Sequence, residues 1–418
     1  MFWYWCFAAP AVLLAWLSLL GQRKRADYVA RRLAQQPQLL PPACVIVPVK
    51  GEDEGLRENL AALASLNYPD YELVIVARAA SDIPPGVLPH RATIVLAHGE
   101  DSHASEKVQN LSAAVGAAGK RAHVYAFADS DGRVTPRWLR ALIAPLEEPG
   151  VGASTGFRWF APEPPGFWLL LRSVWDAAVL ECLPPDGAAF AWGGAMAIRK
   201  ETFFEIGVLG AWKNAVSDDY ALSAAVRRAG LRVAYAPGAL VPSRQRLSAG
   251  RFLEWARRQL VLTRVYRPRL WWPALVAYLV YCGGMAASAA ACVRGYRLAE
   301  WALIAQLAPG MWKGLHRAIL AKAALPEYAA WFKRHSWAHA VWTPLATWLW
   351  LMVLCASSFG HTIRWRGYTY DLWSRSPTDK ANPCATGPSS DTLIHKGGFN
   401  VAKDKSPKKE VKKPKKKK

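Results

Sequence analysis

Two carboxylates separated by one residue, Asp129 and Asp131, stand directly after a hydrophobic segment at residues 123–128. Oxygen ligands at this spacing can hold a divalent cation, Mn²⁺ or Mg²⁺, and the cation can bridge the oxygens of a diphosphate. Such a site would neutralise the charge that develops on a nucleotide-diphosphate leaving group. Acidic turns use the same residue types. The position at the end of a predicted strand, where a sheet enzyme exposes its ligand groups, favours the metal site.

A second pair of carboxylates, Asp218 and Asp219, follows Ser217. Attack by a hydroxyl on a sugar carbon needs a base as well as a stabilised leaving group. Asp219 is the candidate base, and Asp218 would orient or support it. Acidic residues also favour the N-terminal end of a helix because of the helix dipole, and this pair alone would be explained in that way. The strand-end carboxylates earlier in the chain favour the catalytic interpretation.

The elements that would position these groups follow an α/β pattern. Apolar and amphipathic segments alternate along the chain, with strands predicted at 43–48, 71–77, 92–96 and 123–128 and helices at 54–66 and 106–118. Short apolar strands that alternate with helices predict a largely parallel sheet covered on both faces. Ligands of such sheets bind beyond the carboxyl ends of the strands, which is where the first carboxylate pair lies.

The first 20 residues are continuously apolar and are followed at once by a basic cluster at 22–25. A secretory signal carries its positive charge before the apolar run, so we interpret residues 1–21 as an uncleaved transmembrane anchor. The basic cluster would hold the C-terminal end of this anchor in the cytoplasm. A cleaved signal or a buried apolar N-terminus is the weaker alternative.

Membrane segments are also predicted after the sheet region. Residues 270–293 are long enough to cross the hydrocarbon of a bilayer, and residues 338–359 form a second such run. Residues 298–332 mix Trp and apolar residues with Lys and Arg, which indicates an interfacial amphipathic segment, with a third spanning helix as the alternative. The predicted organisation is an anchor at 1–21, a catalytic domain at 43–269, membrane and interfacial helices at 270–372, and a disordered basic tail at 373–418.

Composition restricts the classes of partner. The formal net charge is +22, and the last 16 residues, which hold ten Lys, carry +8 of it. A basic chain can bind nucleic acid, anionic lipid or phosphorylated small molecules, but no zinc-finger spacing, basic-zipper heptad or aromatic RNA-binding motif occurs, so nucleic acid is not predicted as a partner. The 21 Trp and the hydrophobic fraction of 52% favour a membrane protein. The seven Cys include no CxxC pair and predict neither a disulfide framework nor a zinc site.

Further motifs resemble those of the GT-A glycosyltransferases, in particular the ceramide glucosyltransferase family. In chain order these motifs are residues 48–54 after the first strand, 66–72 before the second strand, Asp82, and the segments 107–110, 192–200, 217–220, 328–333 and 363–368. The likeness runs from about residue 48 to residue 372. It implies an α/β fold, a GT-A nucleotide-diphospho-sugar transferase domain, with transmembrane helices on its N-terminal and C-terminal sides.

The resemblance also implies roles for individual residues. Asp219 matches the catalytic base of the family, with Gly194 in the acceptor-side segment. Asp82 falls where the family contacts the uridine, and Lys107 lies in the motif near the pyrophosphate. The residues that would bind the donor are Lys50, Asp82, Lys107 and Asp129.

One departure from the family pattern lies before the membrane helices. The family carries Arg/Gln-x-x-Arg-Trp there, whereas this chain has Arg251, Glu254 and Trp255. An Arg at the middle position would meet phosphate, and Glu would repel it. Arg257 and Arg258, a turn further along a predicted helix, would supply the missing charge. Arg251, Trp255 and Arg258 are therefore candidate acceptor-binding or supporting residues.

The resemblance implies transfer of glucose from UDP-glucose to a ceramide-like membrane lipid by single displacement, with inversion. It implies a multi-pass integral membrane protein whose catalytic domain faces the cytoplasm, at a bacterial inner membrane or, in a eukaryote, at the Golgi or ER. A hopanoid or other lipid glycosyltransferase that uses UDP-N-acetylglucosamine or another donor is the enzymatic alternative. A processive polysaccharide synthase would need more spanning helices for an extrusion channel.

An inactive membrane adaptor that keeps the fold is the alternative of another class. Glu254 and the apolar pair Ala79 and Ala80 beside Asp82 support it. The carboxylates retained at 129, 131 and 219 argue against it, because a silent fold has no need of them.

Overall fold

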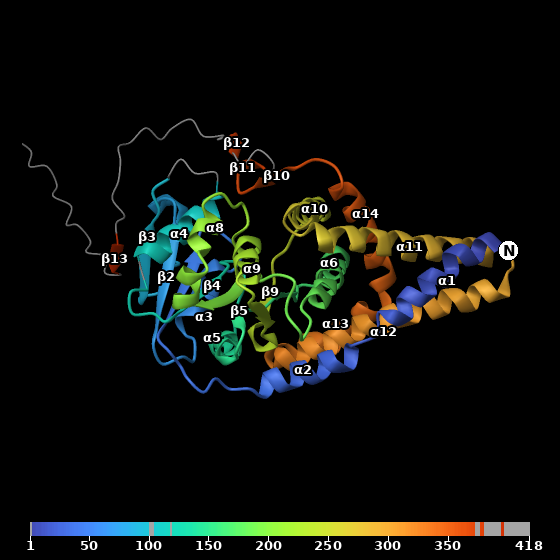
Figure 1. The fold of residues 1–418 in the computed structure, drawn as a ribbon, viewed down its shortest axis with the longest axis horizontal. Coiled ribbons are helices and arrows are strands. Elements are labelled where there is room, and N and C mark those ends of the chain that lie inside the picture. Colours follow the sequence, from blue (N-terminus) through green and yellow to red (C-terminus); the bar gives the residue numbers. More distant parts are fainter. Residues whose placement is uncertain (1, 100–103, 118, 373–376, 380–393, 397–418) are drawn as a thin grey trace, which may run out of the picture.

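The computed structural model describes residues 2–99, 104–117, 119–372, 377–379 and 394–396. An eight-stranded mixed sheet forms one end of the molecule, with the strand order β13-β3-β2-β1-β4-β7-β5-β8 (Figure 1). Its strands are β1 (Ala43–Pro48), β2 (Tyr71–Ala77), β3 (Ala92–Leu96), β4 (Val124–Ala128), β5 (Val151–Thr155), β7 (Ala195–Arg199), β8 (Arg232–Tyr235) and β13 (Ile394–Lys396). Strands β1, β2, β3 and β4 pair with one another in parallel, whereas β13 pairs antiparallel with β3.

Helices cover both faces of this sheet because its strands alternate apolar side chains between the two faces. Ile46 of β1 belongs to the core packed under one set of helices, and Val45 and Val47 belong to the core on the opposite face. The first set is α4 (Glu106–Ala117), α8 (Val208–Trp212) and α9 (Asp218–Arg228), and the opposite set is α3 (Leu56–Ala64) and α5 (Trp138–Ile143). Truncation of a fully buried side chain such as Ile46 to Ala costs about 2–5 kcal/mol.

The four predicted strands and the two predicted helices are confirmed, with helix ends that differ by one or two residues. The sheet is less parallel than predicted, because β7 runs antiparallel to both of its neighbours. Between β4 and β7 the chain forms several elements instead of a single crossover helix, so it can re-enter the sheet from the opposite end. These elements include β6 (Arg158–Phe160) and α6 (Phe167–Ala177), and β6 pairs with β9 (Val241–Ser243).

The remaining helices gather at the other end of the molecule, where α1, α11 and α12 project together away from the sheet (Figure 1). The helices outside the sheet region are α1 (Phe2–Leu17), α2 (Gln22–Ala34), α10 (Ala249–Tyr266), α11 (Pro268–Val293), α12 (Arg297–Ala324), α13 (Ala329–Val341) and α14 (Thr343–Ser357), and α7 (Lys200–Glu205) lies beside β7. Short 3₁₀ helices are η1 (Ala80–Asp82), η2 (Ala144–Glu147), η3 (Ala178–Cys182), η4 (Pro237–Ala239) and η5 (Pro326–Tyr328). A small sheet of β10 (Thr362–Trp365), β11 (Tyr368–Asp371) and β12 (Pro377–Asp379) follows α14.

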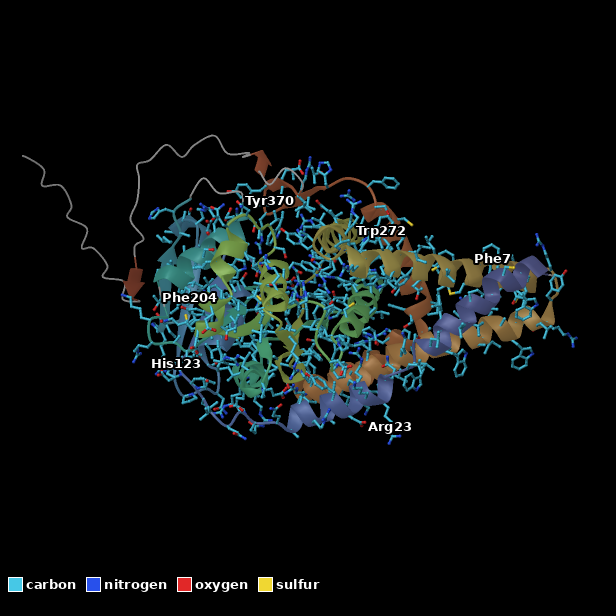
Figure 2. All side chains as sticks on the ribbon, in the orientation of Figure 1. Phe7, Arg23, His123, Phe204, Trp272 and Tyr370 are labelled. Carbon is cyan, nitrogen blue, oxygen red and sulfur yellow. The ribbon has the colours of Figure 1, made fainter. Side chains whose placement is uncertain are left out.

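Among the described residues, two stretches are straight, long and apolar enough to cross a membrane: Tyr4–Ala34, which comprises most of α1 together with α2, and Pro268–Val293, which is α11. Large apolar side chains on them face outward, as Phe7 and Trp272 show with exposed fractions of 54% and 57% (Figure 2). Such outward apolar surface fits a lipid environment better than water. The apolar segments predicted at 1–21 and 270–293 are therefore present as helices.

The helical region adds detail to the sequence prediction. Residues 338–359 are not one straight helix, because α13 and α14 meet at a 65° bend next to Pro344, whose ring disfavours a continuous helix. Together the two helices are apolar enough for a broken span or a re-entrant loop. Most of the segment 298–332 lies in α12, a single 28-residue helix packed against α1 and α11, and its interfacial position stays a prediction. The disordered tail predicted at 373–418 lies outside the described residues apart from β12 and β13.

Candidate active site

The carboxylates that follow β4 meet two cations from other elements. Arg158, the first residue of β6, donates a hydrogen bond of 2.8 Å from Nη2 to Asp131 Oδ1 and lies 3.4 Å from Asp129 Oδ2. Lys107 of α4 donates from Nζ to Asp129 Oδ1 at 2.9 Å. Both carboxylates are thus held at the carboxyl edge of the sheet, as the strand-end position predicts.

Burial and neighbouring charges shift the pKa values of the two carboxyl groups in opposite directions. Burial by itself raises the pKa of Asp129, but the cations Lys107 and Arg158 outweigh burial and hold that pKa below its usual range. Burial raises the pKa of Asp131 above its usual range, since Arg158 offsets it only in part and Asp129 repels the charge. Asp129 is therefore the stronger anionic ligand of the pair.

Asp218 and Asp219 open helix α9 after the N-cap residue Ser217. Asp219 Oδ2 accepts a hydrogen bond of 3.1 Å from the backbone N–H of Gly193, and its Oδ1 accepts from the Tyr220 N–H at 2.7 Å and from the Ser217 hydroxyl. These bonds fix the carboxylate at the edge of the cavity that it lines. Asp218 and Asp219 therefore occupy the N-terminus of a helix and also lie beside the strand-end carboxylates. The helix-dipole interpretation and the catalytic interpretation are both compatible with this position.

Lys107 connects the two carboxylate pairs. Its Nζ lies 3.2 Å from Asp218 Oδ2 in addition to its bond with Asp129. Burial raises the pKa of Asp218 to about 6, with Asp219 and Asp129 adding repulsion that Lys107 offsets in part. The carboxylates of Asp129 and Asp218 raise the pKa of Lys107 against the effect of burial, so the lysine stays charged. One buried cation therefore holds the strand end of β4 and the start of α9 together.

The glycines that precede β7 are required by close approach. A Cβ on Gly194 would lie 2.7 Å from Asp129 Oδ2 and 2.2 Å from the ring of Trp192. A Cβ on Gly193 would lie 2.5 Å from Asp218 Oδ2 and 2.9 Å from Lys107 Nζ. These contacts are shorter than any side chain tolerates, so Gly at both positions lets the backbone enter the site. Gly194 does not itself line the cavity, whereas Gly193 does.

The predicted donor-side residues divide into two groups. Lys50, at the end of β1, pairs with Glu106 at 2.5 Å and lies 4.3 Å from the ring centre of Tyr368. It lines the same cavity as Lys107 and Asp129. Asp82 does not line that cavity, although its carbonyl accepts a hydrogen bond of 2.7 Å from the Gly51 N–H, one residue beyond Lys50.

The hairpin of β10 and β11 covers this donor side of the cavity. Arg366, in its turn, donates from Nη1 to the Lys50 carbonyl at 2.8 Å and from Nη2 to Asp53 Oδ1 at 2.8 Å. Asp53 Oδ2 in turn accepts from the hydroxyl of Ser130 at 2.6 Å, between the two strand-end carboxylates. The segment 363–368 that resembles a family motif is therefore tied to the loop after β1 and, through Asp53, to the loop after β4.

The candidate residues of α10 line the cavity: Arg251, Trp255 and Arg258. Glu254 lines it as well, so the departure from the family pattern faces the site. Arg257 points elsewhere, donating to the carbonyls of Ala356 and Phe359 at 3.2 and 3.1 Å. Of the two arginines a turn further along, Arg258 is thus the one placed to compensate Glu254.

A single cavity of about 1780 Å³ joins these groups to the helical end of the molecule. It begins at the strand-end carboxylates and passes the side chains of Trp175 and Asp176 on α6. It then continues between α1, α11, α12 and α14, where its lining includes Leu14, Leu17, Ala274, Tyr278, Ala346 and Trp350. The cavity is therefore continuous from the charged side chains at the sheet edge to the apolar side chains of the helices.

Arg158, Asp176 and Arg366 line the cavity but were not identified from the sequence, and neither was Arg172 of α6. Arg158 contacts both strand-end carboxylates, and the charges of Arg158 and Arg172 act on Asp176. Arg172 packs on the ring of Phe160 at 3.6 Å. Arg366 lies in a segment that did carry a family resemblance. The other three carry no local motif, because their role comes from tertiary contacts.

The donor set of Asp129 and Asp131 fits a divalent cation in type. Carboxylate oxygens are the ligands that Mn²⁺ and Mg²⁺ prefer. Among the described residues no group of three or more His, Cys, Asp or Glu side chains could hold a metal. A cation here would therefore take its further ligands from a diphosphate and from water, as magnesium sites for phosphates do.

No curated protein matches the chain. A mannosyltransferase from Pyrobaculum calidifontis, solved with GDP-Man and Mn²⁺, is 18% identical, with a TM-score of 0.46 over 84% of this chain and 98% of that chain. GalNAc-T7, solved with UDP, GalNAc and Mn²⁺, is 13% identical, with a TM-score of 0.37 over 55% of this chain and 51% of that chain. The profile of glycosyl transferase family 21 matches residues 3–376, nearly the whole chain. The chain belongs to glycosyl transferase family 21.

Proposed function

We propose that this glycosyltransferase transfers a hexose from a UDP-sugar to a hydroxyl of a membrane lipid, with inversion at the anomeric carbon. The observation that carries the proposal is the continuity of the cavity from the strand-end carboxylates to the apolar helices. A lipid can keep its chains among those helices while its hydroxyl reaches Asp219. A soluble acceptor would have no use for the apolar half of this space.

The reaction follows from the position of the base. The acceptor oxygen attacks the anomeric carbon, the bond from that carbon to the β-phosphate oxygen breaks, and the hydroxyl proton passes to Asp219. Because attack and departure occur on opposite faces of the sugar, one displacement inverts the centre. The bonds from Gly193 and Tyr220 orient the Asp219 carboxylate for this transfer.

On the donor side the cations of the site would bind the diphosphate. Lys50, Lys107 and Arg258 line the cavity, and the backbone of Gly51, next to Lys50, is hydrogen-bonded to Asp82, the predicted uridine contact. Asp129 and Asp131 would hold the divalent cation, which when bound neutralises charge on the departing diphosphate. Arg158, paired with both carboxylates, would keep them in place before the cation and the donor arrive.

We propose UDP-glucose as the donor and a ceramide-like lipid as the acceptor, on the strength of the family motifs. The catalytic domain at 43–269 would face the cytoplasm, and the anchor at 1–21 and the helices within 270–372 would hold it at the membrane. The helices Tyr4–Ala34 and Pro268–Val293 support this placement.

The experiment uses membranes from cells that express the full chain, with labelled UDP-glucose, ceramide and Mn²⁺, followed by lipid extraction and chromatography. The proposal predicts a labelled lipid that depends on Mn²⁺ or Mg²⁺. A product that forms only with UDP-N-acetylglucosamine, or only with a hopanoid acceptor, would keep lipid glycosylation and replace the substrates. No product and no UDP-sugar hydrolysis across donors and lipids would support the inactive adaptor instead.

A further inference from the structure

A cluster of charged side chains lies at the helical end of the cavity, away from the strand-end carboxylates. Glu181 of η3 pairs with Arg317 of α12 at 3.3 Å and with Arg25 of α2 at 3.4 Å. Lys313 lies one turn before Arg317 on the same face of α12 and is the third cation whose charge acts on Glu181. Glu181, Lys313 and Arg317 all line the cavity.

The positive charges of this cluster outnumber its negative charges among the described residues. Three cations surround the single carboxylate of Glu181, and Lys313 forms no hydrogen bond or ion pair there. Arg317 is only 6% exposed, and its buried Nε has no hydrogen-bond partner among the residues that the structure describes. Uncompensated cations in a partly apolar cavity are costly. An anion that enters through the cavity would compensate the excess positive charge of Lys313 and Arg317.

The level of the cluster along the helices identifies the kind of anion. The apolar helix α1 ends at Leu17, and Gln22, the first residue of α2, donates a hydrogen bond of 3.0 Å to Glu181 of the cluster. Lys313 lies 16 residues beyond the first residue of α12, or about 24 Å along the helix axis. The hydrocarbon of a bilayer is about 30 Å thick. With the outer end of α12 at one membrane surface, Lys313 and Arg317 reach the level of the opposite layer of headgroups, where phosphate is the abundant anion.

We propose that Lys313 and Arg317 form a binding site for the phosphate of an acidic bilayer phospholipid, whose acyl chains lie against the apolar cavity wall that Leu14 and Tyr278 provide. The site rests on the proposed membrane placement and shares its apolar wall with the proposed acceptor, but its test does not require sugar transfer. Glu181 holds Arg317 in position, so the guanidinium keeps donors free for a phosphate oxygen. Lys313 contributes a charge that has no ion-pair partner among the residues that the structure describes.

The test measures binding of acyl-chain-labelled phosphatidylglycerol to the purified full chain in neutral detergent, by fluorescence anisotropy. Lys313→Gln should weaken binding at least about fivefold, the effect of one cation near a lipid phosphate. Lys322→Gln is the matched control, since Lys322 lies on the same helix, is exposed and does not line the cavity. It should leave the affinity unchanged.

Equal weakening by both variants, or no change in either, would overturn the proposal, since it would show attraction to general surface charge or no site at all. Unlabelled diacylglycerol, which lacks the phosphate, should fail to displace the probe. Inorganic phosphate at millimolar concentration should also fail, because it gains nothing from the apolar wall. Displacement by inorganic phosphate as effective as that by unlabelled phosphatidylglycerol would overturn the assignment to a lipid. Because sugar transfer is not measured, inactivity toward UDP-sugars would not affect the result.

Discussion

Arg158 Nη2 lies 2.8 Å from Asp131 Oδ1, so one of the two strand-end carboxylates is already paired with a protein cation. The arginine side chain is 9% exposed and the carboxylate 16%, which makes this a largely buried pair. Arg158 also reaches Asp129 at 3.4 Å. A single guanidinium therefore contacts both of the carboxylates that would hold the proposed divalent cation.

Arg158→Gln should destabilise the protein by about 3–5 kcal/mol, because it leaves two buried carboxylates with less compensation. The loss should appear as a lower Tm of the purified chain in the presence of EDTA. Mn²⁺ should restore part of the Tm in the variant and add less in the wild type, since the metal replaces the missing positive charge. A variant whose Tm does not respond to Mn²⁺ would argue against a metal held by Asp129 and Asp131.

Gly194→Ala should reduce transfer at least tenfold, because its Cβ would collide with Trp192 and Asp129 and displace the carboxylate. Gly210→Ala is the control: Gly210 lies in α8, and a Cβ there meets nothing within 4 Å. Rates with labelled donor in membranes, corrected for the amount of protein, compare the two. Similar activity in both variants would contradict the close packing of Gly194 against the site.

Arg258→Gln should raise the KM for the UDP-sugar about fivefold or more, since Arg258 would supply the phosphate contact that Glu254 cannot make. Arg257→Gln removes the same charge one residue away but from a side chain bonded to the carbonyls of Ala356 and Phe359. It should lower Tm without changing the KM for the donor. An equal rise in both KM values would mean that only the overall charge of α10 matters.

The free energy of unfolding should depend on pH through the buried carboxyl group of Asp176. Burial raises the pKa of this carboxyl to about 7, with Arg158 and Arg172 opposing burial in part. A carboxyl whose pKa is raised in the folded state contributes stability at low pH that is lost as pH rises through the folded pKa. The wild type should therefore lose about 2–3 kcal/mol between pH 5 and pH 8 from this group.

Asp176→Asn removes that loss, because the amide stays neutral. Its Tm relative to wild type should rise as the pH goes from 5 to 8, in thermal unfolding of both proteins in the same detergent. A Tm difference that is constant across this range, or that falls, would show that the two arginines keep Asp176 ionised throughout.

The sheet could be predicted closely because its signal is local. The segments that became β1, β2 and β3 are short apolar runs bounded by turn residues, and their ends agree with the predicted ones. The same pattern predicted the position of the strand-end carboxylates, because Asp129 directly follows the last residue of β4. Family membership, which the motifs predicted, is also confirmed.

The rest depends on contacts between distant parts of the chain. Nothing near Arg158 in the sequence indicates that it meets carboxylates 27 and 29 residues earlier. The antiparallel direction of β7 and the bend between α13 and α14 arise from packing that periodicity does not report. The cavity itself combines residues from α1 to β11, so only the folded chain brings them together.

The most direct test of the account compares wild type with Asp219→Asn in lipid transfer and in UDP binding. The account predicts that the variant loses at least about a hundredfold in transfer, the usual contribution of a general base. Its affinity for UDP with Mn²⁺ should stay within about twofold of wild type, because Asp219 would act on the acceptor hydroxyl. Retained transfer, or an equal loss of transfer and UDP binding, would contradict the assignment of Asp219 as the base.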